Sequence, residues 1–136
     1  MTNFIFGPDG IWADVGLLLL RVGLFTIFLV HALPKIRKTE ELAAGMGAPK
    51  SMILTLGIAE LVASVLMLFG FSAGIASIII SIVMLGAIFM KVFKWGAAFK
   101  ESSKVGWEFD FILLIVAVSI LLMGPGIISL QSYMIF

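Results

Sequence analysis

The sequence predicts an all-α polytopic membrane protein, folded as an antiparallel four-helix transmembrane bundle in a single domain over residues 1–136. Three observations predict this fold class. Hydrophobic residues make up 62% of the chain and the mean hydropathy is +1.22, whereas soluble domains are about 45–50% apolar. Four apolar runs approach the roughly 20 residues with which a helix crosses the hydrocarbon core. The segments between them are short, which favours antiparallel neighbours.

Composition also excludes several functions. Charged residues are only 12% of the chain and the net charge is +1, so no basic face for nucleic acid is expected. The chain has no cysteine, which excludes disulfides, iron–sulfur clusters and thiol redox chemistry on this chain. No lysine or arginine precedes the first hydrophobic run, so we expect no cleaved signal peptide and a first span that is retained.

The predicted spans follow one another closely along the chain. The first ends at Pro34, the second ends at Gly70 and the fourth ends before a Gly-Pro-Gly sequence, and these residue types are typical of helix ends. Residues 71–73 form a tight uncharged turn, and the other two connectors, 35–51 and 95–106, are polar. The predicted spans are 15–34, 52–70, 74–94 and 107–123.

The basic residues predict how the spans are oriented in the cell membrane. Eight of the nine Lys and Arg residues lie in or beside the two polar connectors. Because cytoplasmic loops carry such an excess, both connectors are predicted on the cytoplasmic side and both chain termini on the other side. The eight are Lys35, Arg37, Lys38, Lys50, Lys91, Lys94, Lys100 and Lys104.

Small residues lie on one face of the third predicted span. Gly74, Ser77 and Ser81 share this face, which permits close approach of another helix. We interpret it first as a packing seam within the bundle. It is also a candidate interface for a homo-oligomer, because four short helices bury little surface without neighbours.

Ionisable residues inside the spans are expected to face the bundle interior and pair, since one at a helix centre costs about 2.5–3.5 kcal/mol. Glu60 is the only ionisable residue of the second span. Arg21 and Glu60 lie at different depths in the membrane, but two long side chains can span that difference, so we predict an Arg21–Glu60 ion pair. On the first span, ionisable and aromatic residues gather within or near an arc of about 80°: Arg21, Phe25, Phe28, His31 and Lys35.

The fourth span begins with two carboxylates on opposite sides of the helix. Glu108 and Asp110 are about 200° apart, so only one of them can face inward. Ser119 falls on the Glu108 side, which favours Glu108 as the inward residue and Asp110 as the one that faces lipid headgroups. His31 and Glu108 are both predicted near the cytoplasmic surface, so a His31–Glu108 contact, direct or through water, is expected.

Each of these residues also has a purely structural interpretation. An Arg21–Glu60 pair could fix helix register without any further function, and His31 could simply bond a backbone carbonyl or water near the interface. Lysines at span ends are expected to extend to lipid phosphates, and tryptophans there to anchor the helices in the interface. These lysines and tryptophans are Lys35, Lys91, Lys94, Trp12, Trp95 and Trp107.

Several stretches of the chain form an ordered set of motifs. The first helix and its charged connector read LLLLRVGLFTIFLVHALPKI and LAAGMGAPKSM, and the later helices read LGIAELVASVLMLFGF and GWEFDFILLIVAVSILLMGPGIISL. Taken together, these stretches resemble the DoxX family of small bacterial and archaeal membrane proteins. The resemblance covers roughly residues 15–130 and rests on the order of the motifs, none of which is specific alone.

The resemblance implies a four-helix membrane bundle that serves as an oxidoreductase component; one relative is a subunit of a thiosulfate:quinone oxidoreductase. It directs attention to Arg21, His31, Glu60 and Glu108 by matched position. Many members carry a histidine near the end of the third helix, where this chain reads MKVFKWG. If that histidine transfers protons or binds a ligand in relatives, the activity of this chain is lost or altered.

The first functional hypothesis is a quinone-linked oxidoreductase subunit. His31 and Glu108 would act catalytically by exchanging protons, and Arg21, Glu60, Phe25 and Phe28 would line the quinone slot. The chain has only one histidine, which excludes a bis-histidine haem within it and leaves haem without support. No metal site is predicted, and electrons would come from a partner redox protein or subunit. The alternatives are a bundle that binds or transports a small lipophilic molecule or lipid, and a non-catalytic structural subunit.

Overall fold

The computed structural model describes residues 10–103 and 106–134, and this part of the chain contains helices and no strand. Lys104, one of the basic residues used to predict orientation, lies outside the described residues. The helices are α1 (Ile11–Arg37), α2 (Thr39–Met46), α3 (Lys50–Phe69), α4 (Ala73–Phe89), the π-helical turn η1 (Met90–Lys94), α5 (Glu108–Met123) and α6 (Leu130–Met134).

Three of the described helices are long and apolar enough to cross a membrane: Ile11–Arg37, Lys50–Phe69 and Ala73–Lys94. The last of these joins α4 and η1. α5 has 16 residues, which span about 24 Å and fall short of a hydrocarbon core of about 30 Å. The all-helical membrane class is therefore confirmed, and the fourth crossing stays a prediction.

The outward faces of the helices are apolar, as contact with lipid requires. On α4, large side chains at intervals of three or four residues are exposed and form one continuous stripe, namely Ile75, Ile78, Ile82, Leu85 and Phe89. An apolar patch of this extent would drive aggregation in water.

The first span extends beyond its predicted bounds of 15–34 at both ends, because α1 covers Ile11–Arg37. Pro34 does not end the helix, because α1 continues to Arg37 and the backbone N–H of Lys38 still donates to the Pro34 carbonyl oxygen at 2.7 Å. Proline inside a membrane-spanning helix is tolerated where neighbours compensate for the lost bond. Much of the polar connector that follows is helical too, because it contains α2. The other predicted boundaries agree with α3, α4–η1 and α5 to within two residues.

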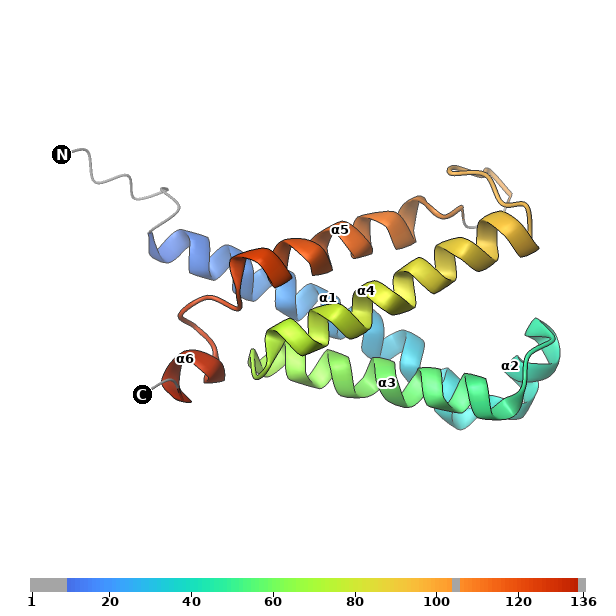
Figure 1. Ribbon diagram of the computed structural model, residues 1–136, viewed down its shortest axis with the longest axis horizontal. Coiled ribbons are helices and arrows are strands. Elements are labelled where there is room, and N and C mark those ends of the chain that lie inside the picture. Colours follow the sequence, from blue (N-terminus) through green and yellow to red (C-terminus); the bar gives the residue numbers. More distant parts are fainter. Residues whose placement is uncertain (1–9, 104–105, 135–136) are drawn as a thin grey trace.

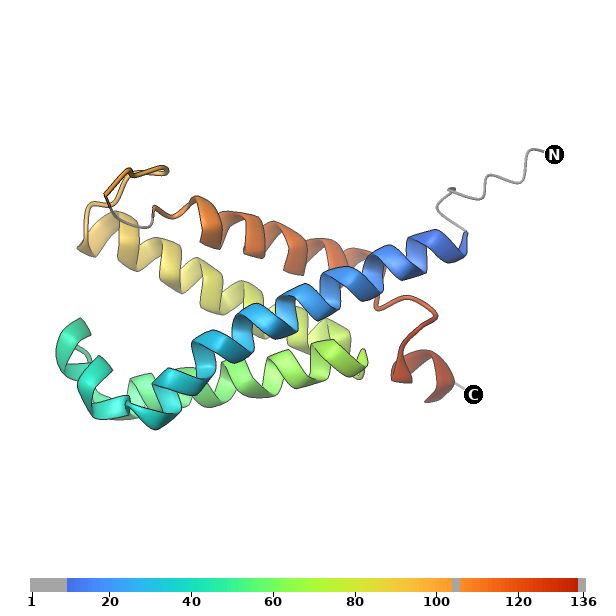
Figure 2. The same ribbon diagram turned by 180° about the vertical axis from the view of Figure 1, so that it is seen from behind.

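The helices associate as two pairs (Figure 1). α1 packs most extensively on α3, and α4 on α5, with α3 and α4 joined by the tight turn at residues 70–72. Figure 2 shows from behind that the two pairs diverge toward the end that carries α2 and the 95–103 segment. Fully buried small residues on α3, α4 and α5 allow these helices to approach closely: Ala63, Ser64, Ala73, Ala76, Ser77 and Ala117.

The small-residue face of α4 packs against other helices of the same chain. Ser77 is fully buried, and a Cβ at Gly74 would lie 3.8 Å from Leu121 of α5. The structure thus supports the packing-seam interpretation of Gly74, Ser77 and Ser81 over an interface with a second copy.

Candidate functional site

A cavity of about 660 Å³ is lined by residues from both helix pairs. This volume lies within the range of about 300–1,000 Å³ that is usual for small-molecule sites. Most of the lining is apolar, including Phe28, Ile53 and Leu113, and Trp95 and Phe109 add further aromatic surface. The ionisable residues at the cavity are His31, Lys35, Glu60, Lys91 and Asp110.

The first ion pair at the cavity joins α1 to α3. The Nζ atom of Lys35 lies 2.5 Å from Oε1 and 2.6 Å from Oε2 of Glu60, and Glu60 is only 2% exposed. The predicted Arg21–Glu60 pair is therefore wrong. Gly57 faces Lys35 and Gly70 faces Arg21, so in this antiparallel register Glu60 lies about 15 Å along the axis from Arg21.

Arg21 instead binds the C-terminal segment at the far end of α3. It is 1% exposed, and its Nη2 donates to the carbonyl oxygen of Ile128 at 2.5 Å. Asp14, two turns earlier on α1, accepts a hydrogen bond from the backbone N–H of Ile127 at 2.8 Å. Arg21 and Asp14 therefore hold the C-terminal segment at Ile127 and Ile128, and we call this set of contacts the clamp. Arg21 is not part of the cavity lining.

The second ion pair joins η1 to α5. Lys91 Nζ donates to Asp110 Oδ2 at 2.6 Å and lies 3.4 Å from the Gly106 carbonyl oxygen. Asp110 is 7% exposed, whereas Glu108 is exposed, so the predicted orientation of the two carboxylates is wrong. The buried face of α5 runs through Asp110, Leu113, Ala117 and Ile120. Ser119, which had favoured the Glu108 side, donates to the backbone oxygen of Ile115.

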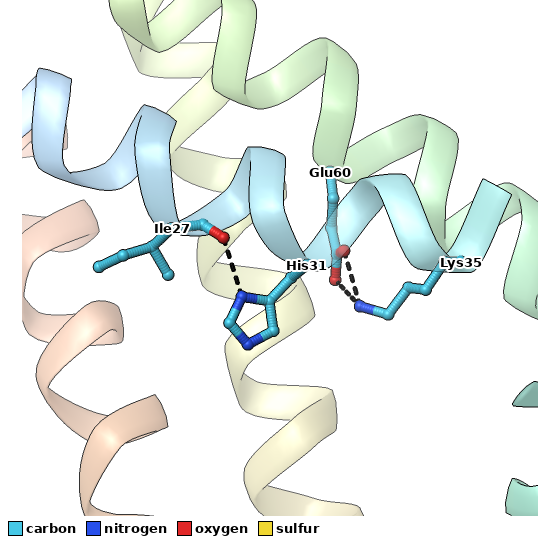
Figure 3. A network of polar contacts seen from close by, with 4 residues as sticks. All are labelled: Ile27, His31, Lys35 and Glu60. Atoms are coloured by element: carbon cyan, nitrogen blue, oxygen red, sulfur yellow. Dashed lines mark hydrogen bonds and ion pairs between the residues drawn. The ribbon is translucent and has the colours of Figure 1, made fainter. Parts of the chain in front are cut away.

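His31 lies beside the first ion pair (Figure 3). Its Nδ1 is 2.8 Å from the carbonyl oxygen of Ile27. A carbonyl can only accept, so Nδ1 carries the proton and Nε2 is left free to exchange one. The ring stacks on Phe109 with centroids 6.4 Å apart, so Phe109 takes the place at His31 that had been predicted for Glu108.

The remaining candidates divide between the cavity and its surroundings. Phe28 is 1% exposed and lines the cavity, whereas Phe25 and Glu108 are not part of its lining. Lys94, expected at the lipid phosphates, donates from Nζ to the carbonyl oxygen of Met46 at the end of α2, at 3.2 Å. Trp95 lines the cavity, and Trp107 packs edge-on against Phe99, with centroids 4.6 Å apart.

Sequence reasoning missed Lys35, Lys91 and Asp110 as site residues. Lys35 carried a signal, because it lies on the same arc of the first helix as His31. Lys91 carried a weaker one, because it is an ionisable residue within the MKVFKWG stretch at the end of the third predicted span. Asp110 carried none, since its burial depends on how α5 rotates against α4.

Two comparisons with known proteins found a match for the chain. The sequence profile of the DoxX family matches residues 16–93 of the chain. The chain is also similar to the Bacillus subtilis (strain 168) protein named "Putative oxidoreductase CatD", with 30% identity over 123 residues, covering 88% of this chain and 87% of that protein. No solved structure matches the chain.

Proposed function

This chain belongs to the DoxX family, and from that premise we propose that it is the quinone-binding membrane subunit of an oxidoreductase. The observation that carries the proposal is the apolar cavity bordered by His31 and two ion pairs. The name of the Bacillus relative supports the reaction class.

The charges at the cavity favour an uncharged ligand. Each ammonium already has a carboxylate within 2.6 Å, in Lys35–Glu60 and Lys91–Asp110, so the four charges cancel in pairs. An anion would have to compete with those carboxylates, and a cation would meet the ammonium groups. A flat quinone ring fits apolar and aromatic walls and presents only carbonyl oxygens to the donors.

His31 supplies proton exchange at the ligand. A quinone becomes a quinol by taking up two electrons and two protons, and the reverse reaction releases them. The free Nε2 of a neutral His31 accepts a hydrogen bond from a quinol hydroxyl and can take its proton. The electrons pass to a partner redox protein when a quinol is oxidised and come from it when a quinone is reduced, because this chain has no cysteine and only one histidine.

Quinone binding is testable through the fluorescence of Trp95, which lines the cavity. In a Trp12→Phe/Trp107→Phe background, Trp95 is the only tryptophan. We expect saturable quenching by 2,3-dimethyl-1,4-naphthoquinone in mild detergent. An absence of saturable quenching in a folded sample would contradict the proposal.

His31→Phe should weaken quinol binding more than quinone binding. The substitution keeps an aromatic ring against Phe109 but removes the Nε2 acceptor that only a quinol hydroxyl can use. We expect about a tenfold loss of quinol affinity. Glu108→Gln is the matched control, since Glu108 is exposed and outside the cavity lining, and it should change neither affinity. Equal losses for quinol and quinone in His31→Phe would contradict the role given to Nε2.

A second candidate function is binding or transport of a lipophilic molecule or lipid without electron transfer. The predominantly apolar lining favours it as well. Lipid that co-purifies with the protein and blocks quenching of Trp95, together with no redox activity in membranes, would support this candidate instead.

We propose further that α5 is the fourth crossing, and that the end bearing the basic residues faces the cytoplasm. The chain has no cysteine, so a single introduced cysteine reports its own side of the membrane. Tyr133→Cys, at a position 74% exposed, should react with an impermeant maleimide in intact cells, and Ser102→Cys only after lysis. The opposite labelling pattern would reverse the orientation, and labelling of both from one side would remove the fourth crossing.

A further inference from the structure

Each ion pair at the cavity connects the two helices of one pair. Lys35–Glu60 joins α1 to α3, and Lys91–Asp110 joins η1, at the end of α4, to α5. The cavity is lined from both helix pairs. The two pairs diverge toward the end of the molecule that carries α2 (Figures 1 and 2). The cavity therefore has one ammonium group on each of its two sides.

Each ammonium keeps an N–H donor for a ligand. A lysine ammonium has three donors. Lys35 uses two of them on the two oxygens of Glu60. Lys91 uses one on Asp110 and directs a second, at a longer 3.4 Å, to the Gly106 carbonyl oxygen. One donor remains on each side, and both lysines line the cavity.

The local backbone supports a ligand-directed role for Lys91. It lies in η1, where the backbone N–H of Trp95 donates to the carbonyl oxygen of Met90, five residues earlier, at 3.1 Å. Such π-helical turns are rare and occur frequently at functional sites. The turn contributes two residues to the cavity lining, Met90 and Lys91, and Trp95, which also lines the cavity, follows it directly.

We propose that the cavity recognises a ligand at two points, with Lys35 donating to an oxygen acceptor at one end of a flat ring and Lys91 donating to an oxygen at the opposite end. This places both lysines among the specificity-determining residues for a 1,4-dione. The inference rests on the proposed quinone function and adds the ligand geometry and the second contact. A ligand that bridges Lys35 and Lys91 also links the two helix pairs.

The test compares three ligands of similar shape by quenching of Trp95 in the Trp12→Phe/Trp107→Phe background. They are 2,3-dimethyl-1,4-naphthoquinone, the monoketone 2,3-dimethyl-1-tetralone and 2,3-dimethylnaphthalene. Methyl groups on the quinone hinder addition of lysine to the ring. With both lysines present, the dione should bind about tenfold more tightly than the monoketone, because a charged donor serves each carbonyl.

Removing one contact point should abolish that preference. Lys91→Met alone would leave Asp110 buried without its partner, so the informative variant is Lys91→Met/Asp110→Leu, which removes both charges. In this variant the dione and the monoketone should bind equally. Lys94→Met is the matched control, since Lys94 is in the same turn but outside the cavity lining, and it should keep the tenfold preference.

The outcomes separate this inference from the function on which it rests. A tenfold preference that persists in Lys91→Met/Asp110→Leu, or equal binding of dione and monoketone by the parent protein, overturns two-point recognition while leaving a quinone site in place. Failure of all three ligands to quench Trp95 in folded protein overturns both proposals.

Discussion

Gly70→Ala is expected to destabilise the protein by about 3 kcal/mol or more. Gly70 ends α3 with a φ of +63°, a conformation that costs an L-residue roughly 1–2 kcal/mol. A Cβ there would lie 1.9 Å from Arg21 Nη1 and 2.5 Å from Ser129 Cβ, and overpacking of this kind costs a further 1–3 kcal/mol or so. The new methyl group would occupy the space in which α3, Arg21 and the C-terminal segment meet.

The C-terminal segment should detach first in this variant. It is held by the bonds from Arg21 to Ile128 and from Ile127 to Asp14, and by a 3.3 Å bond from the Gln131 N–H to the Gly70 carbonyl oxygen. Thermal unfolding in mild detergent measures the loss of stability, and protease cleavage of a C-terminal tag measures the detachment. Gly23→Ala is the matched control, because a Cβ at that helical position would meet nothing within 4 Å in the described part of the chain beyond its own helix backbone and chain neighbours, and the substitution should be neutral or slightly stabilising. Equal stability of Gly70→Ala and Gly23→Ala would contradict the clamp.

The helices were predictable because hydropathy and helix ends are local properties. Gly70 adopts the left-handed conformation expected of a helix-terminating glycine. Pro34 misled the prediction, since inside a membrane-spanning helix its missing N–H is tolerated. The helical α2 was missed because a charged stretch with glycines on either side of Met46 has no apolar run that would indicate a helix.

The ion pairs were harder to predict, because they depend on the register between helices. The arc that contains Arg21, His31 and Lys35 follows from one helix alone and correctly marks the polar face. Which of its cations meets Glu60 depends on the offset between α1 and α3, and the close contact of Gly57 with Lys35 sets that offset. The depth of each residue in the membrane, as judged from the sequence alone, was not precise enough to show whether Lys35 or Arg21 meets Glu60.

The fourth helix illustrates the same limit for rotation. The separation of Glu108 and Asp110 by about 200° is a property of the helix and was predicted correctly. Their absolute orientation depends on the packing of α5 against α4 and on the 95–106 segment. Gly106 there approaches Phe99 so closely that a Cβ would lie 2.3 Å from its carbonyl oxygen. The backbone N–H of Glu108, at the start of α5, also donates to the Phe99 carbonyl oxygen at 3.0 Å, so the rotation of α5 depends on a contact with a segment outside the helix.

Removal of the Glu60 carboxylate should have the largest effect at the site. Glu60→Ala leaves the Lys35 ammonium, 17% exposed, without its counter-ion in an apolar environment, and breaking a buried pair in this way costs about 3–5 kcal/mol. Glu40→Ala is the matched control. It removes one partner of the exposed Lys50–Glu40 pair, which should cost no more than about 1 kcal/mol. Thermal unfolding in detergent measures both.

A paired substitution then separates stability from ligand recognition. Lys35→Met/Glu60→Leu replaces both charges with apolar side chains of similar size, and such exchanges are often neutral or stabilising. If the pair only fixes helix register, this variant should bind 2,3-dimethyl-1,4-naphthoquinone as tightly as the parent. If Lys35 is a donor to the ligand, the variant should stay folded and lose about tenfold in affinity, because the cavity keeps its shape but not its polar contact on the α1 side. Full affinity in a stable double variant would therefore assign the Lys35–Glu60 pair to structure alone.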